Sequence, residues 1–227
     1  MLRHNLILQR IEQAAMKAGR EPGQVKLVAV SKGQPAASLR ALAQAGQLCF
    51  GESYLREAED KIEILADCPD LDWHFIGRLQ SNKSGRAVKF FSMVESVHKL
   101  DLARRLSAQA GQQNKSLDVL IQVNLAGEAS KSGCNEHEAE SLAQHICALP
   151  HLRLRGLMTL PPLYHDPEKT RPYFARLRRL AEQLGRVLPP GSMQELSMGM
   201  SSDFEAAIAE GATLVRVGTA LFGSREE

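Results

Sequence analysis

Short apolar runs alternate with helical patterns along almost the whole sequence. The predicted strands are Lys26–Ser31, Leu48–Gly51, Asp72–Ile76, Ser92–Glu95, Leu117–Asn124, Leu152–Met158, Gln194–Leu196 and Leu214–Val217. The predicted helices between and after them are Ala36–Ala45, Tyr54–Leu65, Ser81–Phe90, Lys99–Ala110, Glu136–Leu149, Glu168–Leu188 and Phe204–Glu210. Strands that alternate with helices in this way are expected to pair in parallel.

The number of predicted strands favours a closed barrel over an open doubly wound sheet. An open sheet usually has fewer strands and a glycine-rich turn after the first one, whereas residues 31–35 read SKGQP. The 227 residues lie close to the lower limit of about 200 for a barrel, and no linker divides them. We therefore expect an α/β fold: a single (β/α)₈ TIM barrel over residues 1–227, with an extra N-terminal helix.

Composition argues against several classes of partner. The 28 Lys and Arg residues nearly balance the 26 Asp and Glu residues, so neither nucleic acid nor an anionic membrane is expected as a partner. No apolar stretch approaches the roughly 18 residues of a membrane span, and residues 1–20 lack the apolar core of a signal peptide. The four cysteines show no zinc-finger spacing. We expect a cytoplasmic protein with reduced thiols and no bound metal.

Lys32 follows the first predicted strand and continues one of its faces. Side chains alternate along a strand, so Lys32 lies on the same side as Val28 and Val30. Such a lysine either extends into solvent or contributes to a site. In TIM barrels the chemistry gathers at the carboxyl ends of the strands. An uncharged amine there can attack an aldehyde, which makes Lys32 a candidate imine-forming residue.

Two later segments are suited to a phosphate. Residues 197–203 (SMGMSSD) link the seventh predicted strand to a helix, and residues 218–220 (GTA) follow the eighth. Barrel phosphate sites are commonly built from the loops after strands seven and eight, where exposed amides attract anions. Arg216, in the eighth strand, needs an acceptor, and an ion pair with a neighbouring carboxylate is the alternative to a role in a site.

Residues 77–84 (GRLQSNKS) differ from a nucleotide-binding P-loop because Asn82 replaces the second glycine. That glycine lets the backbone wrap around phosphate, and no clear acidic metal-binding strand follows. We do not expect a nucleotide site, although Lys83 stays a candidate for holding an anion near the barrel mouth. His74 lies between two aromatic residues, a setting more typical of a hydrogen-bonded structural histidine than of a catalytic one.

Several motifs in one order resemble the pyridoxal-phosphate homeostasis protein family, also called the YggS/PROSC family. Its fold is similar to the barrel domain of alanine racemase, fold type III among proteins that use pyridoxal 5'-phosphate (PLP). The motifs span nearly the whole chain: LVAVSK (27–32), FGESY (50–54), HFIGRLQSNK (74–83), SKSG (130–133), RGLM (155–158), LSMGMS (196–201) and VRVGT (215–219).

The resemblance implies that the chain holds PLP as an imine on Lys32, with Arg216 facing the pyridine nitrogen. Ser201, Gly218 and Thr219 are expected to hold the phosphate, and Lys131 is similar to the family's second lysine near the cofactor. The full set of expected cofactor-binding residues is Lys32, Ser53, His74, Asn82, Lys131, Met200, Ser201, Arg216, Gly218 and Thr219. Ser53 replaces the family's usual asparagine, so a shorter side chain must reach the cofactor or use water.

Two functions stay open at this point. An arginine opposite the ring nitrogen leaves that nitrogen unprotonated and makes the ring a weaker electron sink, which favours a PLP carrier for intracellular PLP homeostasis. The alternative is an amino-acid racemase or related PLP-dependent enzyme, which needs a base on each face of the imine. Similar racemases position the second base, a tyrosine, with help from another domain, and we expect none before the sequence ends at Glu227. We expect a monomer whose partners are PLP, other B6 vitamers and apo PLP-dependent enzymes.

Overall fold

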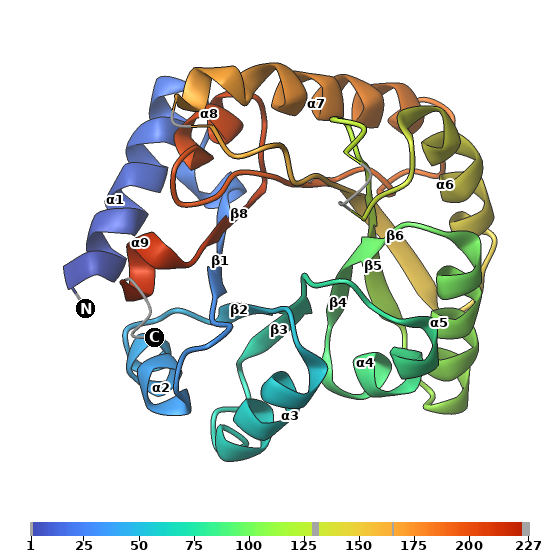
Figure 1. The fold of residues 1–227 in the computed structure, drawn as a ribbon, viewed down its shortest axis with the longest axis horizontal. Coiled ribbons are helices and arrows are strands. Elements are labelled where there is room, and N and C mark those ends of the chain that lie inside the picture. Colours follow the sequence, from blue (N-terminus) through green and yellow to red (C-terminus); the bar gives the residue numbers. More distant parts are fainter. Residues whose placement is uncertain (1, 129–131, 165, 224–227) are drawn as a thin grey trace.

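Eight parallel strands form a closed barrel in chain order, and the last strand pairs with the first. The computed structural model describes residues 2–128, 132–164 and 166–223. The strands are β1 (Lys26–Val30), β2 (Cys49–Glu52), β3 (Asp72–Phe75), β4 (Met93–Val97), β5 (Leu117–Gln122), β6 (Leu152–Met158), β7 (Glu195–Ser197) and β8 (Leu214–Val217). Figure 1 shows them as an inner ring with the helices around it. The predicted (β/α)₈ TIM barrel is confirmed.

The helices cover the outside of the barrel. They are α1 (Leu2–Lys17), α2 (Ala36–Gln44), α3 (Leu55–Ile64), α4 (Ser84–Phe90), α5 (Leu100–Gln112), α6 (Ala139–Cys147), α7 (Arg171–Gly185), α8 (Phe204–Ala209) and α9 (Thr219–Phe222). Short 3₁₀ helices span Pro22–Gln24, Ser81–Lys83, Glu136–Glu138 and Pro167–Lys169. The extra N-terminal helix, α1, packs against α8 and α9. Among the helices described here, none is both long and apolar enough to cross a membrane.

Alternation along the strands separates two apolar layers. Leu27 and Ala29 belong to the large layer between the sheet and the helices. Val28, between them, faces the barrel interior, where it packs in a small apolar group. The other buried members of that group are Cys49, Met93, Leu120, Met158 and Leu214. Because this interior layer is apolar, polar side chains that point into it need partners there.

Several element boundaries differ from the predictions, and one helix was not predicted. The helix predicted from Ser81 begins with a 3₁₀ turn, and the α-helix proper starts at Ser84; such tight turns are common at helix ends. Strand β4 extends to Val97, which places Glu95 in mid-strand. Helix α9 was not predicted, because its four residues are too short for a helical period to show.

Candidate functional site

A cavity of about 650 Å³ lies at the carboxyl ends of the strands. Most of the predicted cofactor-binding residues line it: Lys32, Ser53, Met200, Ser201, Arg216, Gly218 and Thr219. They come from the ends of β1 and β2 and from the loops around β7 and β8. These elements lie close together because β8 pairs with β1 when the barrel closes. The volume lies within the range typical of small-molecule sites.

Lys32 lies in a tight turn directly after β1. The Gln34 amide donates to the Ser31 carbonyl at 3.0 Å, and Gly33 between them has a φ of 71°, which glycine adopts without steric cost. The Gly33 amide also donates to the Glu57 carboxylate. The Lys32 side chain is half-buried and reaches the cavity. Within the described part of the chain its amine makes no hydrogen bond or ion pair.

A buried cluster beneath this turn holds it in place. The Lys61 ammonium donates to Glu52 at 2.7 Å, to Glu57 at 2.6 Å and to the Ser31 carbonyl at 2.6 Å. The Ser31 hydroxyl donates to Glu52 at 2.7 Å. Burial raises the pKa of Glu52, although the hydrogen bonds from Lys61 and Ser31 act in the opposite direction. The cluster fixes the backbone on both sides of Lys32, and Lys61 therefore positions the candidate imine-forming residue.

Arg216 is buried and lines the cavity. Its guanidinium donates to the Ser197 hydroxyl and to the Thr159 carbonyl, the latter at 2.8 Å, and lies 4.0 Å from Glu95. Burial lowers the pKa of Arg216, while the carboxylates of Glu95 and Asp203 raise it. The sequence predicted either a hydrogen-bond acceptor in a site or an ion pair with a carboxylate for Arg216, and the structure contains both. A guanidinium stays protonated in proteins, so the Arg216 side chain can donate hydrogen bonds in the cavity but cannot act as a base there.

The loops after β7 and β8 together form a group of hydrogen-bond donors. The Arg216 amide in β8 donates to the Gly199 carbonyl at 3.0 Å, which joins the loop after β7 to strand β8. The amides of Gly218 and Ala220 both point at the Ser201 hydroxyl, each at 3.3 Å. A Cβ atom on Gly218 would approach Val30 to 3.3 Å, so glycine keeps this corner open. Backbone amides and a hydroxyl arranged in this way suit an anionic oxygen.

Two of the predicted residues, His74 and Asn82, are not among the described residues that line this cavity. His74 lies deeper in the barrel, where its Nδ1 is 2.7 Å from Glu95. Asn82 lines a neighbouring cavity of about 880 Å³, which shares Ser53 with the first. Lys131 lies outside the described residues. A role in cofactor binding stays a prediction for each of the three.

Two polar residues on interior strands were not predicted as part of the site. Gln122 ends β5, lines the cavity and donates to the Ser132 carbonyl at 2.7 Å. Glu95, in mid-β4, accepts a hydrogen bond from Ser197 and lies between His74 and Arg216. Burial acts to raise the pKa of Glu95, but His74 and Arg216 lower it by more. Each is a polar residue within an apolar strand run, and that pattern is the signal that could have identified them.

Residues 3–226 match the family model of the alanine racemase N-terminal domain. The pyridoxal phosphate homeostasis protein of Pseudomonas aeruginosa is 50% identical over 220 residues, which cover 97% of this chain and 93% of that protein. The chain belongs to the pyridoxal phosphate homeostasis protein family. The pyridoxal phosphate homeostasis protein of Escherichia coli K12 is 41% identical over 227 residues, which cover 98% of this chain and 96% of that protein.

Solved structures agree with this family assignment. PipY of Synechococcus elongatus, solved with PLP bound, is 41% identical and superposes with a TM-score of 0.85, covering 94% of this chain and all of that one. PipY without PLP gives a TM-score of 0.86. Alanine racemase from Corynebacterium glutamicum, 20% identical with a TM-score of 0.68, shares the fold, and this chain matches 61% of it.

Proposed function

We propose that this chain binds PLP in the cavity through an imine on Lys32 and serves intracellular PLP homeostasis without robust catalysis. One observation carries the proposal: the Lys32 amine, the Arg216 guanidinium and the donors around Ser201 and Gly218 meet at one cavity. Relatives at 41–50% identity bear the name pyridoxal phosphate homeostasis protein, and PipY was solved with PLP. In this proposal residues 1–227 form one domain that acts as a cytoplasmic monomer.

The residues present fit this cofactor. An amine without a partner among the described residues faces the space where an aldehyde would react. The amides of Gly218 and Ala220 and the hydroxyl of Ser201 supply donors for a phosphate at one corner. When bound, PLP supplies a reactive aldehyde and an electron-withdrawing ring. Arg216 donates hydrogen bonds and holds its own proton, and the cluster around Lys61 orients the backbone of Lys32.

The described residues favour binding over racemization. A racemase needs a second base on the far side of the cofactor, which in similar barrels is a tyrosine. Tyr54 is exposed and lines the neighbouring cavity, while Tyr164 and Tyr173 pair with each other, their hydroxyl oxygens 3.3 Å apart. Since none of them lines the main cavity in the described structure, we propose that PLP and other B6 vitamers are carried there and exchanged with apo PLP-dependent enzymes.

Purified protein incubated with PLP is expected to absorb in the visible region because an imine extends the conjugation of the ring. Borohydride reduction followed by peptide mapping should place about one label per chain on Lys32. A label mainly on Lys83 or Lys131 would overturn the assignment of Lys32, and the absence of any label would overturn the imine itself. Sustained conversion of L-alanine to D-alanine, lost in Lys32→Ala, would replace the carrier proposal with the racemase.

Ser201→Ala is expected to weaken PLP binding about tenfold, since one hydrogen bond to a charged group contributes roughly 1.5 kcal/mol. Equilibrium dialysis with PLP and with pyridoxal, which lacks the phosphate, measures the effect. Binding of pyridoxal should be unchanged, and so should binding of both ligands to Ser141→Ala, a control on the exposed face of α6. Equal weakening of PLP and pyridoxal would show that Ser201 does not contact the phosphate.

A further inference from the structure

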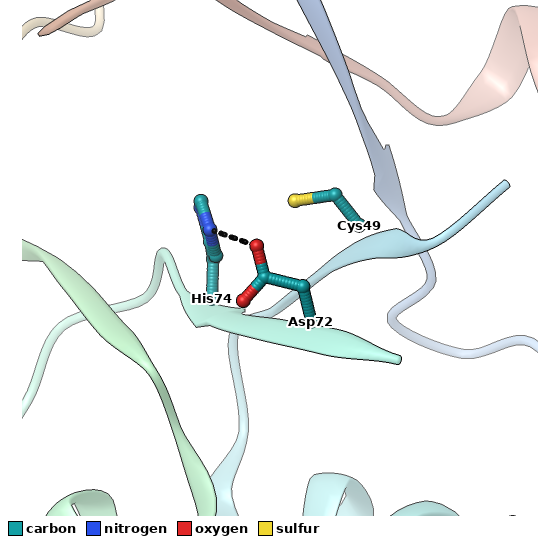
Figure 2. Close-up of side chains that lie close together, drawn as sticks. All are labelled: Cys49, Asp72 and His74. Atoms are coloured by element: carbon teal, nitrogen blue, oxygen red, sulfur yellow. Dashed lines mark hydrogen bonds and ion pairs between the residues drawn. The ribbon is translucent and has the colours of Figure 1, made fainter. Parts of the chain in front are cut away.

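A second group of reactive side chains lies at the opposite, amino-terminal end of the barrel. Cys49 begins β2, Asp72 begins β3 opposite it in register, and His74 follows on the same face of β3. The thiol, one carboxylate oxygen and one imidazole nitrogen all lie within 4.8 Å of one another. Figure 2 shows the three side chains pointing toward a common centre. None of them lines the cavity at the carboxyl end.

His74 is oriented with one ring nitrogen toward this centre. Its Nδ1 is 2.7 Å from the fully buried carboxylate of Glu95, and its Nε2 is 3.3 Å from Asp72. A buried carboxylate that holds one nitrogen of a histidine while the other faces a ligand group is the usual outer arrangement of a metal-binding histidine. Glu95 thus fixes the ring in an orientation suited to coordination.

We propose that Cys49, Asp72 and His74 bind a zinc ion at the amino-terminal end of the barrel. Thiolate, imidazole and carboxylate are the zinc ligands of proteins, with bonds of about 2.0–2.3 Å, so two ligand atoms of one tetrahedral ion lie about 3.5 Å apart. The imidazole nitrogen and the carboxylate oxygen already lie at such a separation, 3.3 Å, and the thiol sulfur lies within 4.8 Å of both. Thiolate and imidazole favour zinc over magnesium or calcium. Asp72 is 31% exposed, which leaves the fourth position to water.

Zinc must displace the Lys26 ammonium from the Asp72 carboxylate. The Lys26 ammonium lies 3.2 Å from Asp72, and because its side chain is 54% exposed it can turn into solvent. Burial acts to lower the pKa of His74, but Cys49 and Asp72 raise it well above its usual value. Zinc ligands bind the ion in their deprotonated forms, so zinc binding should weaken as the pH falls. The exposed edge at Asp72 is the route by which the ion enters.

Equilibrium dialysis of the full chain against Zn²⁺ with metal quantification tests the proposal. We expect about one ion per chain, and affinities at least tenfold lower in Cys49→Ser and in Asp72→Asn. Cys134→Ser is the matched control: that buried thiol lies outside the cluster, and burial raises its pKa to about 12. It should bind zinc like the unmodified chain. Replacing Zn²⁺ with Co²⁺ should give an intense near-ultraviolet band from thiolate coordination, which Cys49→Ser should lose.

Two results would overturn the site. One is the absence of stoichiometric zinc binding by the folded, unmodified chain. The other is binding that Cys49→Ser and Asp72→Asn leave unchanged, which would place the ion on other histidines or carboxylates. Far-ultraviolet circular dichroism establishes whether each variant folds. If Cys49→Ser does not fold, the cobalt spectrum of the unmodified chain decides, because a spectrum without the thiolate band excludes Cys49 as a ligand.

Discussion

Lys32→Ala is expected to stay colourless with PLP, and its borohydride-stable label should fall from about one per chain to background. The imine needs an amine at the position where the turn after β1 meets the cavity, and Lys32 lies there with no partner among the described residues. The variant should still fold, because the Lys32 side chain is only half-buried and the cluster beneath the turn does not involve it. Absorbance spectra and mass mapping of the reduced protein measure both effects.

Two controls separate loss of the imine from loss of the pocket. Lys89→Ala removes an exposed lysine on α4 and should label like the unmodified chain. Pyridoxine phosphate, which has no aldehyde, should still bind to Lys32→Ala because the donors around Ser201 and Gly218 are intact. Full labelling of Lys32→Ala would show that another lysine forms the imine, and loss of pyridoxine phosphate binding would indicate a collapsed pocket.

Lys61→Met is expected to reduce the free energy of unfolding by about 3–5 kcal/mol, since removing one partner of a buried ion pair leaves the other charge uncompensated. The partner is Glu52, whose side chain is fully buried against a Lys61 that is only 6% exposed. The same change frees the Ser31 carbonyl, which accepts from Lys61 at 2.6 Å. Chemical denaturation, monitored by far-ultraviolet circular dichroism, measures the loss.

The pH dependence of this loss has a definite sign. Burial already raises the pKa of Glu52, and without Lys61 nothing offsets that effect as strongly. A group whose pKa is higher in the folded state supports folding below its unfolded pKa and ceases to do so as the pH rises through the folded value. The deficit of Lys61→Met should therefore be smaller at pH 5 than at pH 8.

Two further variants check the origin of the effect. Lys17→Met, an exposed lysine at the end of α1, should change stability by less than about 0.5 kcal/mol. Adding Glu52→Gln to Lys61→Met should recover part of the loss, because it removes the unpaired charge. Additive losses in the double variant would show that Glu52 and Lys61 do not interact energetically.

The fold and the mouth of the site were predictable because both depend on which residues follow one another in the sequence. Alternation of strand and helix gave the barrel, and strand ends gave Lys32 and the loops near Ser201 and Gly218. The family resemblance added Ser53 and Met200, which also line the cavity. Predicted boundaries were less accurate. The helix was predicted to begin at Ser81, but residues 81–83 form a 3₁₀ turn and α4 begins at Ser84, because the sequence pattern does not distinguish a 3₁₀ turn from the first turn of an α-helix.

The interior contacts were not predictable from spacing alone. Cys49 and His74 are 25 positions apart, and they meet only because β2 and β3 pair in one particular register. Glu95 reaches both His74 and Arg216 because the sheet curves into a closed ring. A one-residue shift in strand pairing would turn such side chains to the other face, so contacts across the interior depend on the tertiary structure.

The pairing of β8 with β1 has a consequence during synthesis on the ribosome. Lys32 emerges early, whereas Arg216 and Gly218 are translated almost two hundred residues later. Until β8 docks, β1 presents an unpaired edge, and the binding pocket does not yet exist. We therefore expect closure of the ring and assembly of the pocket to occur together, and a ligand that contacts both strands to favour the closed ring by mass action.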